Sequence, residues 1–508
     1  MRVIAWIALW LVCGSAIGEV EIPAVAYHDI VPARNGDPFA VTVVEFEQQL
    51  AYLRRKGYQP ISLAMLDGAR RGARPLPPKP ILLTFDDGLR SFAVHALPRL
   101  ERHGFPASVS IVTGWADTGR MGDDSGVAVL TWDELRRLSR SPLIEFVSHS
   151  DDLHRGIAAD AQGTFIAAAT ARAFELDRIE DETARERRVS ADLARSAARI
   201  EAELGAAPRA VAWPYGEYDA ALVSAAASLG MTYHFTLDDA PTTLARLPQI
   251  NRFTFRNYRG LDDFARALVL PAHRRRDERF VELDLAMFSG AGVAEGEAML
   301  SRVLERLRLL RVNTVVLHPF NADRTRSFFA TGAMPIEGDL TLRITMAILR
   351  RTGVQRIYLR LRGEDADVLA RDYVRRHPLH GVIVDDDLDP AALERVRGHM
   401  ARYRPAARLF VPPGVARPGS DGTWIRVDAS EPAAAIRALA GRFDPASTLY
   451  LIRDGTGDAS ALRSAMTALR EGGARHFGYV PDAMLTNVPD ARIVAAPLHA
   501  HTIAERRR

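Results

Sequence analysis

Pro80-Ile81-Leu82-Leu83-Thr84-Phe85-Asp86-Asp87-Gly88 is an apolar run that ends in two adjacent carboxylates and a glycine. Its length, with proline before it and glycine after it, is typical of a buried parallel strand. Asp86 and Asp87 therefore stand at the carboxyl end of that strand. In repeating βα folds this end carries the functional loops, because the loops converge there on a rigid scaffold. The run thus predicts both a central strand and a site for chemistry.

Short apolar runs alternate with helical patterns on both sides of this strand, as they do in βαβ units. The expected strands of the first half are residues 23–27, 57–62, 81–85, 107–113, 143–148, 210–214 and 231–237. Helical patterns cover residues 44–56, 91–103 and the long, alanine-rich stretch 165–204. We read this last stretch as a solvated helix without a chemical role.

A second alternation of the same kind follows a basic run at residues 271–279, which we interpret as a linker between two domains. The expected strands of the second half are residues 280–284, 314–319, 356–361, 381–385, 408–411, 448–452 and 476–480. Helices are expected between them, at 295–310 and 391–403 for example. The sequence therefore predicts an α/β chain with a first domain at 19–270, a barrel-like second domain at 280–500, and a basic tail at 501–508.

The composition of the whole chain fits two domains that each have a hydrophobic core. It has 508 residues, of which 47% are hydrophobic and 25% charged, so a disordered protein is excluded. The net charge of +3 is small for this length. The isoelectric point of about 9.1 reflects arginine in place of lysine more than a basic stripe. We therefore expect no nucleic-acid partner.

Residues 1–18 have the pattern of a secretory signal peptide. Arg2 precedes an apolar run at residues 3–12, and small residues at 16–18 suggest cleavage before Glu19. The run is too short for a convincing membrane span. Cys13 is the only cysteine, so an intramolecular disulfide and a cysteine-rich zinc site are excluded. Cys13 is either an ordinary residue of the leader or a lipid-anchoring site. We expect a protein of the periplasm or the outer membrane.

Two histidines, His149 and His154, follow the predicted strand at 143–148 in a segment rich in serine and aspartate. One carboxylate and two imidazoles are a common ligand set for a catalytic divalent metal, and a second carboxylate can then act as a base. An aspartate pair alone is weak evidence, and a lone histidine is more often structural. Their joint occurrence predicts a metal site with Asp86, Asp87, His149 and His154. These ligand types suit zinc, although iron, cobalt or nickel bind them as well.

Trp213-Pro214-Tyr215-Gly216 ends another apolar run. Proline fixes the backbone there, so the amide that follows it is suited to stabilise an oxyanion beside an aromatic wall for a sugar ring. The simpler interpretation is a turn that only ends a strand. Without the other motifs, we would favour the turn.

These motifs, in this order and spacing, resemble those of carbohydrate esterase family 4, the NodB-type polysaccharide deacetylases. They are Thr84–Gly88, the segment from Ser148 to His154, and Trp213–Gly216. The early segment Ala26-Tyr27-His28-Asp29-Ile30 resembles that of the PgaB- and IcaB-type poly-β-1,6-N-acetylglucosamine deacetylases. The stretches 281–284, 328–340 and 472–482 resemble the second domain of PgaB-type proteins. Most of residues 22–496 is covered. One departure is Ala212, where many family members carry arginine.

This resemblance implies a distorted (β/α) barrel and a division of roles among the site residues. The metal ligands would be Asp87, His149 and His154, the general base Asp86 and the general acid His28. The implied oxyanion donor is Tyr215, and the implied substrate contacts are Trp213, Pro214 and Tyr215. The implied reaction is metal-dependent N-deacetylation of an exported poly-β-1,6-N-acetylglucosamine in biofilm formation, with acetate as a product. The polymer is the implied partner, with an outer-membrane export porin as a second one.

Alternatives remain open at this stage. The same first-domain chemistry serves deacetylases of β-1,4-linked chitin and peptidoglycan. The second domain resembles a glycoside hydrolase barrel, and Asp385, Asp386 and Asp387 are candidates for its acidic pair. They are as easily explained by the start of a helix, where aspartate is favourable. The connections of this domain are short and aromatic residues are few, which favours a degenerate barrel that binds polymer or only packs. A chain that binds polysaccharide without catalysis is the remaining alternative.

Overall fold

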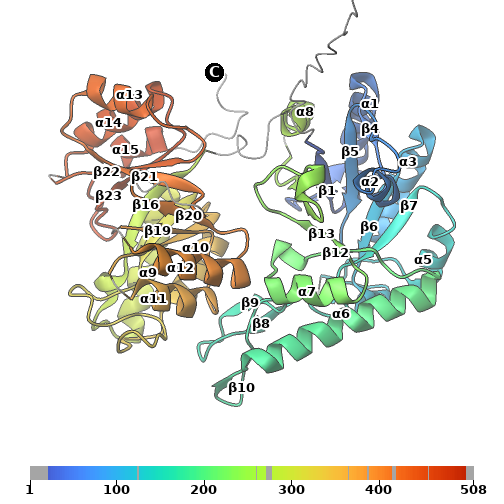
Figure 1. The fold of residues 1–508 in the computed structure, drawn as a ribbon, viewed down its shortest axis with the longest axis horizontal. Coiled ribbons are helices and arrows are strands. Elements are labelled where there is room, and N and C mark those ends of the chain that lie inside the picture. Colours follow the sequence, from blue (N-terminus) through green and yellow to red (C-terminus); the bar gives the residue numbers. More distant parts are fainter. Residues whose placement is uncertain are drawn as a thin grey trace, which may run out of the picture.

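The computed structural model describes residues 21–122, 125–258, 260–269, 277–363, 365–385, 388–414, 419–455 and 457–498. It consists of two α/β halves that lie side by side (Figure 1). The predicted leader with Cys13, residues 271–276 of the predicted linker, and the predicted basic tail lie outside the described residues. Strand β16 begins at Arg279, the last residue of the predicted linker.

A sheet of parallel strands forms the centre of the first half. The strand at 80–85 lies within this sheet, and all six of its side chains are buried. Every strand expected in this half is present. In spatial order the strands are β14 (Gln249–Asn251), β13 (Tyr233–Thr236), β12 (Ala210–Ala212), β7 (Ile144–Ser148), β6 (Ala107–Ile111), β5 (Pro80–Phe85), β1 (Ala24–Tyr27) and β15 (Phe253–Thr254), with β4 (Gln59–Pro60) beside β5.

The two edge strands of this sheet, β14 and β15, are separated in the sequence by Arg252 alone. The chain therefore passes from one edge to the other within a single residue. This is only feasible if the sheet curls until its edges face each other. The first half is thus a nearly closed barrel, as expected from the resemblance. Strands of two or three residues carry almost no periodic signal, so the sequence did not reveal these two.

The stretch at 165–204 differs from its prediction. Helix α6 begins only at Glu182 and ends at Leu204, and the Asp181 side chain caps it by accepting a hydrogen bond from the backbone N–H of Ala184. The residues before it form two antiparallel hairpins, β8 (Gly156–Ala158) with β9 (Phe165–Ala167) and β10 (Phe174–Glu175) with β11 (Arg178–Ile179). The alanines that suggested a helix are buried in a loop, where their carbonyl groups accept hydrogen bonds from Arg185 and Arg188.

The other elements of the first half are connections between these strands. Two short strands, β2 (Ile30–Val31) and β3 (Val41–Thr42), pair with each other. The helices are α1 (Val43–Lys56), α2 (Leu63–Arg70), η1 (Phe92–Ala96), α3 (Leu97–His103), α4 (Thr113–Ala116), α5 (Trp132–Leu138), α7 (Ala220–Ser228) and α8 (Leu261–Val269).

Eight parallel strands close into a second barrel, in the order of the sequence. They are β16 (Arg279–Asp284), β17 (Thr314–His318), β18 (Arg356–Leu361), β19 (Gly381–Val384), β20 (Arg408–Val411), β21 (Gly422–Asp428), β22 (Thr448–Arg453) and β23 (His476–Val480). The sequence analysis missed β21, whose burial alternates less regularly and whose residues include charged ones. The helices are α9 (Val293–Leu310), α10 (Thr341–Arg351), α11 (Ala366–Val374), α12 (Pro390–Tyr403), α13 (Ala433–Ala440), α14 (Ala459–Glu471) and α15 (Ala491–Leu498).

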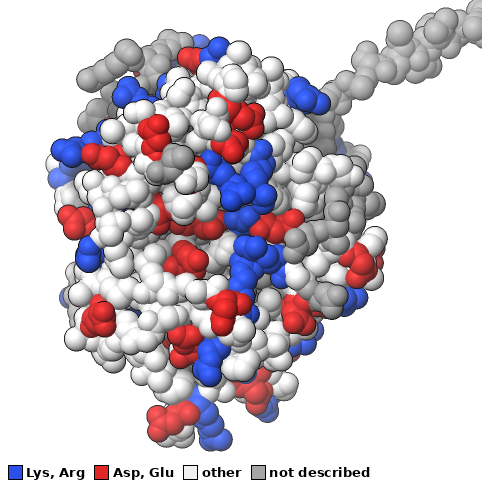
Figure 2. Space-filling view, turned by 90° about the vertical axis from the view of Figure 1, so that its left-hand side faces the viewer, with Lys and Arg blue, Asp and Glu red and all other residues white. Residues whose placement is uncertain are grey.

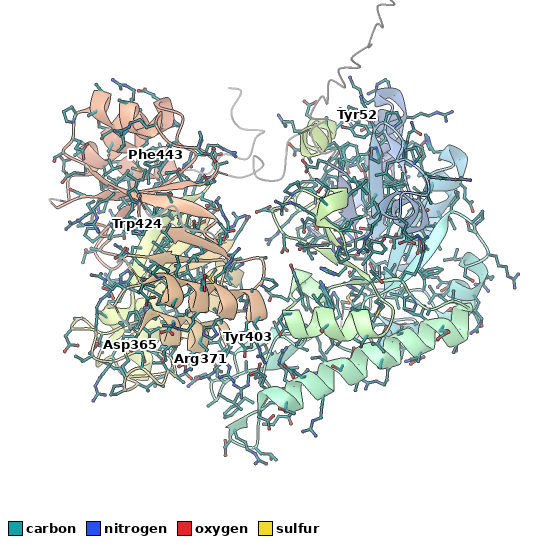
Figure 3. All side chains as sticks on the ribbon, in the orientation of Figure 1. Tyr52, Asp365, Arg371, Tyr403, Trp424 and Phe443 are labelled. Carbon is teal, nitrogen blue, oxygen red and sulfur yellow. The ribbon has the colours of Figure 1, made fainter. Side chains whose placement is uncertain are left out.

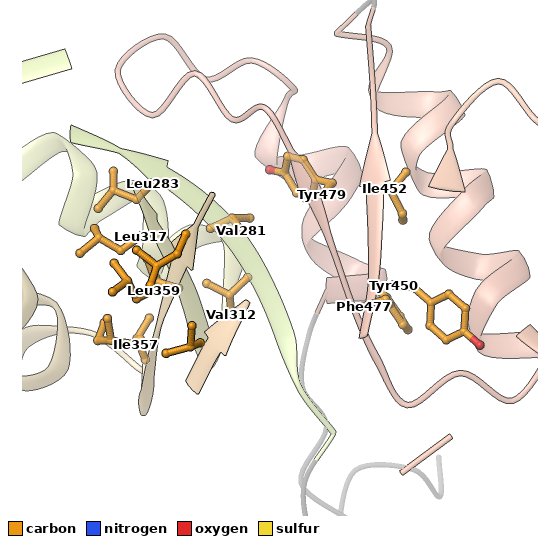
Figure 4. Close-up of a cluster of buried hydrophobic side chains, with 14 of the residues drawn as sticks. Val281, Leu283, Val312, Leu317, Ile357, Leu359, Tyr450, Ile452, Phe477 and Tyr479 are labelled. Atoms are coloured by element: carbon orange, nitrogen blue, oxygen red, sulfur yellow. The ribbon is translucent and has the colours of Figure 1, made fainter. Parts of the chain in front are cut away.

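Successive side chains of each barrel strand point to opposite faces, which creates two layers of core. One layer packs between strands and helices, and its members Val281, Leu283, Leu317 and Leu359 lie close together in Figure 4. The other layer includes Phe280, Val316, Tyr358, Ile383, Phe410, Trp424, Leu449 and Leu451. The barrel is therefore a filled, packed unit and structurally complete, despite its short connections.

The two halves touch along the helices α10 and α12. Leu342 and Met346 of α10 pack on buried residues of the β8–β9 region, Ala159, Ile166 and Ala171. Tyr403 lies at the border of the halves (Figure 3), and its hydroxyl group donates a hydrogen bond of 2.7 Å to Glu182. The second barrel thus contacts segments that follow the carboxyl ends of strands β7 and β12.

The outer face of the second half carries charges of both signs. Figure 2 shows a stripe of basic side chains with acidic side chains on either side of it; the basic residues of this half are all arginines. Within the part of the chain that the structure describes, no helix has the length and apolar character needed to cross a membrane.

Candidate active site

The site lies where strands β12, β7, β5 and β1 end, within a run of five neighbouring strands of the first barrel that also includes β6. Asp86 and Asp87 follow β5, His149 follows β7, Trp213 follows β12, and His28 follows β1. All these strands run parallel, so their carboxyl ends meet at one edge of the sheet. The fold brings together residues that are up to 187 positions apart, from His28 to Tyr215.

Asp87, His149 and His154 form a cluster that fits a metal ion. Oδ1 of Asp87 lies 3.3 Å from Nε2 of His149 and 3.2 Å from Nε2 of His154. All three potential ligand atoms lie within 4.8 Å of one another. Nδ1 of His149 is 2.7 Å from the carbonyl oxygen of Ala212 and must carry the proton of that hydrogen bond, so Nε2 presents its lone pair. Oδ1 of Asp87 is buried and accepts no hydrogen bond from the described residues.

The electrostatics of this cluster agree with its geometry. Burial alone would raise the pKa of Asp87, but its contacts with His149 and His154 hold that pKa well below the ordinary value. Burial likewise opposes charge on His149, yet Asp87 and then Asp86 raise the pKa of His149. Asp87 and His149 are both buried, and each therefore needs a nearby charge of opposite sign to stay ionised. A divalent cation would supply such a charge for Asp87 and leave both histidines neutral as ligands.

The backbone around the cluster adopts unusual angles. Asp87 has φ 69° and Ser150 has φ 73°, in the left-handed region that costs a residue other than glycine about 1 kcal/mol. The next residue, Gly88, has φ 62°, and a Cβ atom there would lie 3.1 Å from the side chain of Ile111. Such strain persists only where the surrounding structure enforces it, and it is commonly found at functional sites.

Asp86 is paired with an arginine that the sequence analysis missed. Nη1 of Arg252 donates a hydrogen bond of 2.6 Å to Oδ1 of Asp86, and the Ser110 hydroxyl donates another of 2.6 Å to the same oxygen. Both of these hydrogen bonds from described residues end on Oδ1 of Asp86. The other carboxylate oxygen, Oδ2, is therefore the one that can accept a proton. Burial would raise the pKa of Asp86, but the charge of Arg252, followed by His149 and His28, keeps this pKa well below the ordinary value.

The arginine beside Asp86 is Arg252, and position 212 is alanine. It occupies the seam between the edge strands β14 and β15, and its side chain is 1% exposed. Ala212 instead contributes its carbonyl group, which orients His149. In the sequence, Arg252 stands out only as a charged residue between two short apolar runs. That pattern does not reveal that its partner in the fold is Asp86.

Replacing Arg252 by lysine or methionine should raise the pKa of Asp86, because burial would remain while the guanidinium is lost. We expect methionine to lower the rate of the reaction that Asp86 serves by about 10-fold or more and to shift the acid limb of its pH profile upward, with lysine intermediate. Arg209→Met, which breaks an ion pair with Glu145 elsewhere in this half, is the matched control. An unshifted profile in a folded Arg252→Met protein would contradict this role.

His28 reaches the site through the pairing of β1 with β5, in which Tyr27 lies beside Phe85. His28 and Asp86 therefore follow neighbouring positions of adjacent strands. The ring of His28 packs on Phe39 with 5.1 Å between ring centroids, and its Nδ1 is buried without a hydrogen-bond partner among the described residues. This position is compatible with the role of proton donor, which remains a prediction.

The predicted aromatic wall reduces to a single residue. Trp213 is 1% exposed and Pro214 is buried; both are enclosed by the surrounding structure, and Trp213 stacks on Tyr218. These two residues therefore support the turn from below and do not present a surface to a sugar. Tyr215 is 53% exposed, and its ring centroid lies 4.5 Å from that of His154. It is the most exposed member of the motif and the one aromatic side chain in it that a substrate can reach.

The acidic run of the second barrel has a structural explanation where it is described. Both oxygens of Asp385 accept hydrogen bonds of 2.8 Å from Nε of Arg360, which also pairs with Glu282. Asp389 caps helix α12. A carboxylate held by a guanidinium in this way is poorly suited to donate a proton, so Asp385 does not have the surroundings of a catalytic acid. Asp386 and Asp387 lie outside the described residues.

Comparison with known proteins gives consistent relatives. Residues 73–234 match the family model described as polysaccharide deacetylase. The chain is 28% identical over 347 residues to a poly-beta-1,6-N-acetyl-D-glucosamine N-deacetylase of Escherichia coli (strain K12), a match that covers 65% of this chain and 51% of the relative. It therefore spans about half the length of that curated relative.

Two solved structures each match about half of this chain. The BpsB deacetylase domain from Bordetella bronchiseptica is 34% identical, with a TM-score of 0.41 and coverage of 46% of this chain and 94% of that domain. A de-N-acetylase from Aggregatibacter actinomycetemcomitans is 26% identical, with a TM-score of 0.46 and coverage of 49% and 100%. Both matches fall on about half of the chain.

Proposed function

Because the first half of this chain belongs to the polysaccharide deacetylase family, we propose that the protein is a metal-dependent N-deacetylase of poly-β-1,6-N-acetylglucosamine. The observation that carries the proposal is the convergence of one carboxylate and two imidazoles, within 4.8 Å, beside a second carboxylate paired with Arg252. In such a hydrolytic site, Asp87 would hold the metal and Asp86 would act as the base. The printed name of the curated relative supports the choice of substrate.

The residues of the site divide the reaction among themselves. A divalent metal held by Asp87, His149 and His154 would acidify a water molecule and polarise the N-acetyl carbonyl group. Asp86 is ionised at neutral pH and accepts the proton of the attacking water through Oδ2. The backbone N–H of Tyr215 donates a hydrogen bond to the oxygen that becomes negative as the carbonyl carbon turns tetrahedral. His28 protonates the amine nitrogen, the C–N bond breaks, and acetate and the free amino sugar result.

Zinc is the metal that we propose, since an aspartate and two histidines suit it, with iron, cobalt or nickel as substitutes. We further propose that the protein acts after export, in the periplasm or at the outer membrane, on a biofilm polymer that an outer-membrane porin then carries outward. The pattern of residues 1–18 and the single cysteine at position 13 support export.

Acetate release from β-1,6- and β-1,4-linked N-acetylglucosamine oligomers, measured side by side, tests the proposal. We expect release from the β-1,6 oligomers that disappears with a chelator and returns with added zinc. Preference for the β-1,4 oligomers would instead indicate a chitin- or peptidoglycan-type deacetylase. If the metal-loaded protein binds both oligomers and releases no acetate from either, the deacetylase proposal fails, and the protein is a binding module.

A further inference from the structure

An arginine of the second barrel reaches the turn that carries Tyr215. Arg404 lies at the end of helix α12, and its side chain is 9% exposed. Nη1 of Arg404 donates a hydrogen bond of 2.8 Å to Oε2 of Glu217, which stands two residues after Tyr215. Nε of the same guanidinium donates to the carbonyl oxygen of His377, at 3.2 Å. A contact within the second barrel thus holds the Arg404 guanidinium in the position from which it binds Glu217.

The turn from Trp213 to Glu217 needs such a restraint. Tyr215 has φ 59°, in the left-handed region that a residue other than glycine rarely adopts, and Gly216 follows with φ 74°. A Cβ atom on Gly216 would lie 3.0 Å from the side chain of Leu237. The amide of Tyr215 therefore points where it does only because both flanks of the turn are held.

The first half supplies most, but not all, of these restraints. Trp213 is anchored in the core on one side of the turn. On the other side, Tyr218 donates to Asp238 at 2.6 Å, and Asp219 caps helix α7 and pairs with Arg185. Between these anchors lies Glu217. From the described residues of the first half, its side chain accepts one hydrogen bond, of 3.4 Å from the Thr170 hydroxyl group, which is longer than the bond from Arg404.

We propose that Arg404 is a positioning residue for the deacetylase site, acting through Glu217 on the oxyanion turn at Tyr215, so that the site is complete only when the second barrel is docked. This inference rests on the proposed function. It gives the second barrel a role in deacetylation for which this barrel need neither cleave nor bind the polymer itself. It also predicts that rate, more than substrate affinity, depends on the contact, because the turn acts on the transition state.

The test uses the full chain and the variant Arg404→Gln, which removes the charge and keeps a polar side chain. Arg402→Gln is the matched control, because Arg402 lies on the same helix and also crosses the border, but pairs at 2.8 Å with Glu182 of helix α6 and not with a residue of the turn. With zinc and a β-1,6-linked N-acetylglucosamine pentamer, we expect Arg404→Gln to lower kcat about 10-fold with little change in KM. Arg402→Gln should stay within about twofold of the parent, and Arg404→Lys should recover part of the loss.

A second readout does not depend on catalysis. 3-Fluorotyrosine at position 215 reports the surroundings of the turn by ¹⁹F NMR without substrate. We expect its resonance to shift or broaden in Arg404→Gln and to stay unchanged in Arg402→Gln. An unchanged resonance, or a parent-like kcat in a folded Arg404→Gln protein, would overturn the inference. If the parent releases no acetate while the resonance still responds to Arg404→Gln, the proposed function fails, and Arg404 positions the turn for another purpose.

Discussion

Replacing Asp86 by asparagine should lower kcat for acetate release by about 10³-fold, the middle of the range for loss of a general base. Asparagine has the same shape and still accepts a hydrogen bond from Ser110, but it does not take a proton from water. The metal ligand Asp87 remains in place beside it. The measurement is kcat and metal content of the purified full chain, on the β-1,6-linked oligomer.

Two comparisons make this result specific. Asp133→Asn changes an exposed aspartate that forms an ion pair with Arg136 of the same helix, α5, and it should leave the rate unchanged. Asp86→Asn should retain a full equivalent of zinc, because Asp86 is absent from the metal-ligand cluster. An active Asp86→Asn protein would assign the base elsewhere. An inactive one without metal would show that Asp86 is itself a ligand.

Removal of one metal ligand should have an effect of similar size for a different reason. His149→Ala deletes the imidazole whose Nδ1 is fixed by Ala212, and with it one of the three convergent donors. We expect zinc to be lost at submicromolar free metal and acetate release to fall by about 10³-fold or more, since the metal supplies several kcal/mol of charge stabilisation. The measurements are metal content after dialysis and kcat at rising zinc concentration.

His95→Ala, a substitution on η1 outside the cluster, is the control and should keep both zinc and activity. High zinc should restore part of the activity of His149→Ala if affinity is the main loss. A His149→Ala protein that retains one equivalent of tightly bound zinc would show that the ligand set is different from Asp87, His149 and His154.

The positions of the strand ends were largely predictable, because each motif stands directly after an apolar run. The metal cluster followed from that fact and from the residue types at 86–87 and 149–154. Three features did not follow. The contact of Arg252 with Asp86 depends on how the sheet closes. The loop at 165–181 depends on arginine donors from α6. The burial of Trp213 depends on the neighbouring Tyr218.

In the second half, local patterns predicted a barrel-like domain and seven of its eight strands, and the strands do close into a barrel. The missed strand β21 holds Trp424, an interior residue whose indole N–H donates to the carbonyl of Val384. The acidic run at 385–389 was ambiguous for a related reason. An aspartate that follows a strand has the same sequence signature in a catalytic pair, in an ion pair with arginine and in a helix cap. For Asp385 the residue that decides between these cases is Arg360, which comes from another strand.

The position of Arg252 between the two edge strands limits how far this protein can be truncated. The stretch that matches the family model, residues 73–234, contains Asp86, Asp87, His149, His154 and Tyr215. It omits His28, which arrives on β1, and Arg252, which arrives where the edge strands meet. A fragment trimmed to the match would thus keep Asp87, His149 and His154 and lose both His28 and Arg252. The proposed site therefore needs a stretch of chain that extends beyond the family match at both ends.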